Sequence, residues 1–175
     1  MIDRLDADLV ALLHAEPRIG VLEASRRLGV ARGTVQARLE KLQRTGVVTG
    51  FGPEVDPAAL GYPVTAFCTL EIRQGLGHRV VADHLAEVPE VLEAHTVSGA
   101  GDLLIRVVAR SNADLQRVID EVVDGEHVVR SSTLIALQTQ FGTRTLPLVQ
   151  AAAREGGPVR RRDVKNDPAP ADGLL

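Results

Sequence analysis

The sequence predicts an α+β protein built from two consecutive domains, and three observations support this. Residues 1–46 hold three segments with apolar side chains at helical spacing, separated by Pro and Gly. Residues 64–138 instead alternate β-branched runs with helical periods, in the order β-α-β-β-α-β. Between them, residues 52–57 contain two Pro and a Gly. We therefore expect domains at residues 1–52 and 53–146.

Two helices are expected first. Asp3 or Asp6 can cap the N-terminus of a helix that runs to about Ala15. A second helix spans about residues 22–28. Gly29 follows it directly, where a helix C-terminus often needs a left-handed residue.

A third helix is expected at about residues 32–45, with Val35, Leu39 and Leu42 forming one buried stripe. Helix, tight Gly-containing turn and helix make a helix-turn-helix. Residues 47–51 read as a short β segment, either a wing or a strand that leaves the module. The first domain is thus predicted to be a winged helix-turn-helix.

Charge is distributed unevenly along the chain. The whole chain carries a net charge of -3, but residues 18–44 hold seven basic and two acidic side chains. Residues 53–146 hold seven Arg and thirteen acidic residues. A basic module attached to an acidic one is typical of a localised contact with double-stranded DNA.

The N-terminal part of the second helix of such a module usually meets the bases. Side chains expected to contact bases are Arg32, Thr34, Gln36 and Arg38. Side chains expected to contact phosphates are Arg26, Arg27, Lys41 and Arg44. The alternative is an ordinary amphipathic helix whose charged face is only solvated.

The second domain reads as a ferredoxin-like sandwich. Strands are expected at residues 64–72, 91–98, 103–109 and 128–138, and helices at residues 77–87 and 112–123, the latter capped by Asn112. Two helices cover one face of such a sheet, and the other face needs a cover. We therefore expect at least a homodimer.

After about residue 147 the pattern weakens. Two Gly, a basic run at residues 160–162 and two Pro indicate a flexible tail at residues 147–175. We expect it to aid solubility, and the alternative is a weak, sequence-independent attraction to DNA.

Several classes of protein are disfavoured. Cys68 is the sole cysteine, so no internal disulfide or CxxC zinc site is expected. The five His lack the spacing of a local metal motif, and no nucleophile arrangement or phosphate loop is present, so we expect no enzyme and no cofactor. No apolar stretch is long enough to span a membrane, and the acidic N-terminus is unlike a signal peptide, so a cytoplasmic location is expected.

The order of several dispersed segments resembles the Lrp/AsnC, or feast/famine, family of transcriptional regulators. The segments are LDADLVALL, LGVARGTVQARLEKLQRTGVVTGF, VDPAALGYPVTAF, VSGAGDLLIRVV and STLIAL, which together span about residues 2–140. The resemblance implies a winged helix-turn-helix joined to an ACT-like domain that senses ligands and oligomerises. It further implies no catalysis, dimers that assemble to tetramers or octamers, and effectors that are mostly free amino acids.

In this family effectors bind near the turn between the second and third strands. The corresponding residues here are Ser98, Gly99, Ala100, Gly101 and Asp102. Glycines leave backbone N–H groups open to a carboxylate, and Asp102 could answer an ammonium or orient the turn. The alternative is a plain hairpin connection in which Asp102 caps its own backbone.

The sequence departs from the family pattern at three places. Many relatives carry an acidic and an aromatic residue where Ala100 and Gly101 stand. His127 and its neighbours replace an Ile-Pro-Gly-Val pattern, and Ala31 replaces a helix-capping Ser or Thr. We expect a regulator that responds to an amino acid, and the alternative is an architectural DNA-binding protein that needs no ligand.

Overall fold

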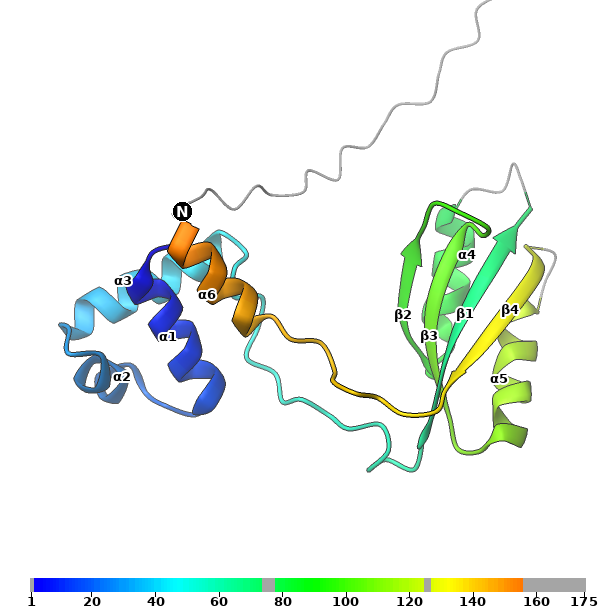
Figure 1. Cartoon of the computed structure of the whole chain (residues 1–175), viewed down its shortest axis with the longest axis horizontal. Coiled ribbons are helices and arrows are strands. Elements are labelled where there is room, and N and C mark those ends of the chain that lie inside the picture. Colours follow the sequence, from blue (N-terminus) through cyan, green and yellow to red (C-terminus); the bar gives the residue numbers. More distant parts are fainter. Residues whose placement is uncertain (1, 74–77, 125–126, 156–175) are drawn as a thin grey trace, which may run out of the picture. The chain divides into compact units, whose positions relative to one another are not determined.

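The computed structural model describes residues 2–73, 78–124 and 127–155, which form two compact units (Figure 1). Of the described residues, the first unit contains 2–52 and 141–155, and the second contains those within Pro53–Gln140. The sequence-based prediction had continued the second domain to residue 146. In the structure the chain returns to the first unit earlier, so the second unit is an insertion within the first.

Helix α1 (Arg4–Ala15) begins with a reciprocal capping box. The Asp3 carboxylate accepts a hydrogen bond from the Asp6 amide at 2.9 Å, and the Asp6 carboxylate accepts one from the Asp3 amide at 3.2 Å. Both acids therefore fix the start of α1. Helix α2 (Val21–Leu28) ends at Gly29, whose φ of 66° is the left-handed conformation that the sequence predicted there.

Helix α3 (Arg32–Arg44) starts after Ala31, which makes no side-chain cap hydrogen bond. The predicted stripe is confirmed: Val35 and Leu42 are buried, and Leu39 packs partly buried against them. Together with residues of α1 and α2 they form the apolar core of the helix-turn-helix.

The β segment predicted at residues 47–51 is wrong, because these residues form no strand. The amides of Val47 and Val48 instead donate to the Leu42 carbonyl at 2.9 and 3.1 Å, and both side chains pack against the helical core. The physical reason is that one short extended run has no partner strand in this unit, and an isolated strand is not stable.

The second unit contains a four-stranded antiparallel sheet in the order β2-β3-β1-β4 (Figure 1). The strands are β1 (Val64–Ile72), β2 (Val91–Thr96), β3 (Leu103–Ala109) and β4 (Val128–Ala136). This order and the two intervening helices confirm the ferredoxin-like prediction.

Helices α4 (His78–Glu87) and α5 (Asn112–Val123) lie against one face of the sheet (Figure 1). The core between them and the sheet contains alternate residues of the central strands, such as Cys68 and Ile105. One detail of the prediction is wrong: Ser111, not Asn112, caps α5, because its hydroxyl accepts a hydrogen bond from the Asp114 amide at 3.1 Å.

The other face of the sheet carries apolar side chains that are exposed in the described part of the chain. Phe67 is 39% exposed and Leu134 is 71% exposed, and they are register partners on β1 and β4. The partly buried Leu104 of β3 occupies the same face.

A sixth helix, α6 (Leu146–Glu155), forms where the sequence predicted the start of a flexible tail. It packs against α1 within the first unit. The rest of the predicted tail, residues 156–175, lies outside the described residues. No described helix combines the length and the apolar character needed to cross a membrane.

Candidate DNA interface and effector turn

Helix α3 presents a mixed polar surface made by small and basic residues. Arg32, Gly33 and Gln36 are exposed near its start, and the Gln36 amide nitrogen donates to Glu40 at 2.7 Å. Thr34 is half-buried, whereas Arg44 in the last turn is exposed. Gly33 has no side chain, so DNA could approach the helix closely at this position. The polar side chains of Arg32 and Gln36 beside it can donate hydrogen bonds to bases or phosphates.

Two of the predicted contact residues are held by acids of α1. Arg38 Nη1 lies 2.6 Å from Asp3 Oδ2 and 2.7 Å from Asp6 Oδ1. Lys41 Nζ lies 2.7 Å from Asp6 Oδ2. The Asp6 side chain has no exposed surface, while 26% of the Arg38 side chain is exposed. We call Asp3, Asp6, Arg38 and Lys41 the α1–α3 clamp.

The clamp changes the acidity of its carboxyls. The hydrogen bond from Arg38 holds the pKa of Asp3 below its usual value. Burial by itself would raise the pKa of Asp6, but hydrogen bonds from Lys41 and Arg38 outweigh burial and lower it. Both carboxylates are therefore ionised at neutral pH, and the clamp is a charged network.

Sequence reasoning recognised Asp3 and Asp6 as helix caps but missed their second role. The only sequence signal for the pairing with α3 was two acids spaced three residues apart at the start of α1. The same spacing is also expected for a capping box, so it does not by itself indicate a contact with another helix. Pairing with α3 depends on how the helices pack, which the sequence does not state. An open hollow of about 530 Å³ lies at the clamp, between the start of α1 and α3.

The two arginines of α2 are exposed and weakly paired. Arg26 lies 3.4 Å from Glu23, and Arg27 lies 3.4 Å from Glu23 and 3.2 Å from Glu16. Exposed pairs of this kind contribute little to stability, so phosphate can compete for the guanidinium groups.

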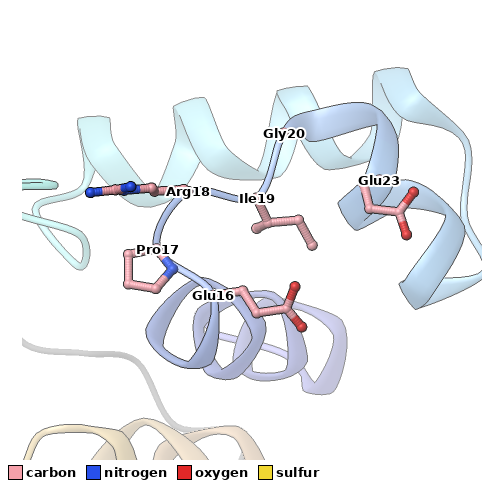
Figure 2. A pocket seen from close by; sticks show the side chains of 6 residues that line it. All are labelled: Glu16, Pro17, Arg18, Ile19, Gly20 and Glu23. Atoms are coloured by element: carbon pink, nitrogen blue, oxygen red, sulfur yellow. The ribbon is translucent and has the colours of Figure 1, made fainter.

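A second open hollow, of about 550 Å³, lies at the turn between α1 and α2 (Figure 2). Figure 2 shows the carboxylates of Glu16 and Glu23 on one side of this turn and Arg18 extending the other way. Both carboxylates contact Arg27. Of the two pairs, Glu16–Arg27 links the end of α1 to α2, whereas Glu23–Arg27 lies within α2.

The turn between β2 and β3 is fixed to the end of β1. The Asp102 amide donates to the Leu70 carbonyl at 2.9 Å, and the Ile72 amide donates to Asp102 Oδ2 at 2.8 Å. Asp102 therefore orients the turn against a neighbouring strand, rather than capping its own backbone.

Gly101 packs tightly beneath the turn. A Cβ atom at this position would lie 2.2 Å from Thr69 Cγ2 and 3.2 Å from the Leu70 carbonyl oxygen. Any larger residue at position 101 would need a different backbone path or a smaller residue at position 69. Close packing against Thr69 and Leu70 is thus what requires a glycine at this position.

The outer part of the turn is open. Ser98, Gly99 and Ala100 are exposed. Among the residues that the structure describes, the amides from Ser98 to Gly101 donate no hydrogen bond. Free amides in a turn are suited to an anion such as a carboxylate.

His127 lies directly before β4 at the same end of the sheet, and its carbonyl accepts a hydrogen bond from the Arg73 amide at 2.9 Å. Its Nδ1 atom is buried without a hydrogen-bond partner in the described structure. The sequence favoured an exposed loop histidine, whereas the side chain is half-buried. No group of acidic, His or Cys side chains within the described ranges could hold a metal ion.

Two domain families match the chain. The AsnC-type helix-turn-helix domain matches residues 2–43, and the Lrp/AsnC ligand binding domain matches residues 65–146. The regulatory protein AsnC of Escherichia coli is 31% identical over 139 residues, which cover 79% of this chain and 91% of that protein. The HTH-type transcriptional regulator FL11 of Pyrococcus horikoshii is 29% identical over 147 residues, covering 84% of this chain and 97% of that protein.

Solved structures give the same result. The structure of E. coli AsnC superposes with a TM-score of 0.77 at 29% identity, covering 84% of this chain and 99% of that chain. A feast or famine regulatory protein of M. tuberculosis, solved in complex with L-methionine, superposes with a TM-score of 0.73 at 26% identity, covering 82% of this chain and 97% of that chain.

Proposed function

Because this chain belongs to the Lrp/AsnC family of transcriptional regulators, we propose that it binds specific DNA in the cytoplasm and that an amino acid controls its assembly and its DNA binding. The observation that carries the effector part is the turn at residues 98–102. Its outer amides are open, and its base is fixed to β1 by Asp102. A relative of this fold is described as a complex with L-methionine, which supports an α-amino acid as the class of effector.

DNA binding is assigned to the exposed residues of α2 and α3. Base contacts fall to Arg32, Thr34 and Gln36, and phosphate contacts to Arg26, Arg27 and Arg44. Arg38 and Lys41 are bound by the acids of the clamp, and we assign phosphate contacts to the parts of their side chains that remain exposed. Phosphate neutralisation provides most of the affinity, which should fall steeply with salt.

Assembly is assigned to the open face of the sheet. A second copy is the occupant that we propose, because this face carries register-paired apolar side chains, Phe67 and Leu134, on a regular antiparallel surface. An identical sheet offers the matching surface for a two-fold dimer. Dimers would then present two α3 helices about one DNA turn apart and could assemble further to tetramers or octamers.

Fluorescence anisotropy tests this function. The full-length protein is titrated onto DNA from upstream of its own gene and onto random DNA of equal length, with and without a pool of amino acids. If the protein binds the upstream DNA more tightly than the random DNA, and the amino-acid pool changes its affinity, the result supports a regulator that responds to an amino acid. Equal binding to both DNAs and no effect of the pool would favour the architectural alternative, which the small residues Ala100 and Gly101 make reasonable.

Two variants of Asp102 sharpen the effector test. Asp102→Asn keeps an oxygen that can accept from the Ile72 amide but removes the charge, whereas Asp102→Ala removes both. Loss of the response in both variants indicates that the carboxylate pairs with an ammonium. Loss only in Asp102→Ala indicates that Asp102 acts by holding the turn.

A further inference from the structure

Helix α6 has one apolar face, and that face is partly covered. Leu146, Val149, Ala152 and Ala153 are half-buried and recur at helical spacing. The residues between them point away from this face: Leu148 is 70% exposed and Ala151 is exposed. A helix with one covered stripe is a docked helix, since a free one would be exposed on all sides.

The partner of α6 is α1, against which it packs (Figure 1). Ala7 of α1 is 6% exposed, yet it lies outside the apolar cluster that α1 forms with α2 and α3. Ala11, four residues on, is half-buried. Helix α6 therefore covers a second face of α1, where small residues on both helices allow a close approach.

Helix α1 is also the helix that holds α3. Asp3 and Asp6 precede or begin α1, and they bind Arg38 and Lys41 of α3 through the clamp. A contact that holds α1 in place therefore also helps to hold α3, the helix to which we assign DNA binding. A continuous set of contacts runs from α6 through α1 to α3.

Helix α6 lies almost entirely beyond the match to the ligand-binding domain family. The ligand-binding domain match ends at residue 146, where α6 begins. The match to FL11 covers 97% of that protein but only 84% of this chain, and the helix-turn-helix match starts at residue 2. The unmatched part is therefore at the C-terminal end.

We propose that α6 is a fourth helix of the DNA-binding unit and that its docking on α1 controls DNA affinity. When α6 is docked, α1 and its clamp hold α3 in the arrangement that binds DNA. When α6 is released, α1 loosens and binding weakens. This inference rests on the proposed DNA-binding function.

A pair of matched variants of the full-length protein tests the inference. Ala152→Asp places a carboxylate on the face toward α1, and Ala151→Asp places the same group on the exposed side one residue away. The measurements are hydrogen exchange of the α1 amides and the dissociation constant for the upstream and random DNAs at fixed salt. We expect Ala152→Asp to speed exchange in α1 and to raise the dissociation constant by about five-fold or more, the lower end of typical couplings between sites. Ala151→Asp should match the wild type in both.

Other results would overturn the inference. Unchanged exchange in Ala152→Asp would show that α6 does not cover α1. Faster exchange with unchanged DNA affinity would show that α6 only supports the fold. If Ala152→Asp unfolds the unit, Val149→Ala is used instead. It removes apolar contact on the same face of α6 without adding a charge, and the same two measurements are made on it. If the wild type binds neither DNA, the proposed DNA-binding function is wrong, and so is the proposal that α6 controls DNA affinity. The hydrogen-exchange data would still show whether α6 docks on α1.

Discussion

Arg38 Nη1 lies 2.7 Å from Oδ1 of Asp6, a carboxylate with no exposed surface. The same nitrogen also lies 2.6 Å from Asp3 Oδ2. An arginine at the centre of the helix assigned to DNA is therefore bound to the protein itself. Moving it toward a base would leave a buried carboxylate with one partner fewer, which is costly. Arg38 is better placed to anchor α3 than to read sequence.

Removing the buried charge should weaken the helix-turn-helix. In Asp6→Asn, Lys41 loses its ion pair with Asp6, whereas Arg38 keeps Asp3. We expect the free energy of unfolding to fall by about 1–3 kcal/mol, the range for losing hydrogen bonds to charged groups. Urea unfolding followed by circular dichroism measures the change. Asp8→Asn is the control, because Asp8 is 56% exposed on the same helix and lies 4.0 Å from Arg4.

The clamp also predicts how stability depends on pH. Folding lowers the pKa values of Asp3 and Asp6, so the unfolded chain binds more protons near its own carboxyl pKa of about 4. The stabilisation is therefore complete above that pH and is lost as the pH falls through the lower folded values. Urea midpoints measured from neutral to acid pH should fall more steeply in the wild type than in Asp3→Asn/Asp6→Asn. Parallel curves would contradict this role of the two acids.

Arg32 and Arg38 should differ in what they contribute to DNA binding. Arg32 is exposed at the start of α3, whereas Arg38 belongs to the clamp. Arg32→Ala should reduce the preference for specific over random DNA by roughly 1–3 kcal/mol, as for a base-reading arginine. Arg38→Ala should weaken both DNAs alike and lower stability. Anisotropy titrations on both DNAs distinguish the two roles. If Arg38→Ala weakened binding to the specific DNA alone, Arg38 would be a base-contacting residue after all.

The elements that sequence predicted well are those set by local pattern. The spacing of Val35, Leu39 and Leu42 and the glycine at position 29 fix α3 and the turn before it, and both are confirmed. The strands of the second unit were found for the same reason, since runs such as Val64–Ile72 carry a period of two.

The features that sequence missed depend on contacts between distant segments. The pairing of Asp6 with Arg38 joins residues 32 positions apart, and α6 packs against α1, which lies at the other end of the chain. Residues 47–51 have strand composition but no partner strand, so Val47 and Val48 join the helical core instead. Local patterns do not encode such partners.

The packing beneath the effector turn predicts a sensitive position. In Gly101→Ala the new Cβ would meet Thr69 Cγ2 at 2.2 Å, so β1 or the turn must shift, and we expect a lower thermal midpoint of the second unit. Thr69→Ser removes the Cγ2 atom and should restore part of the loss in the double variant. The rest should persist, because the Leu70 carbonyl oxygen would still lie 3.2 Å from the new Cβ. Without any rescue, the contact with Thr69 Cγ2 would not be what makes this position sensitive.

The open sheet face predicts the assembly state. Leu134 is 71% exposed and lies opposite Phe67 on the face that α4 and α5 leave uncovered. Leu134→Glu would place a charge in a dimer interface of apolar side chains, so sedimentation should show a shift toward the monomer. Val80→Glu is the control, because Val80 is 44% exposed on α4, on the opposite side of the sheet. If Leu134→Glu sediments like the wild type while Val80→Glu dissociates, the copies associate through the helical face, and the two α3 helices of a dimer would be spaced by a different interface.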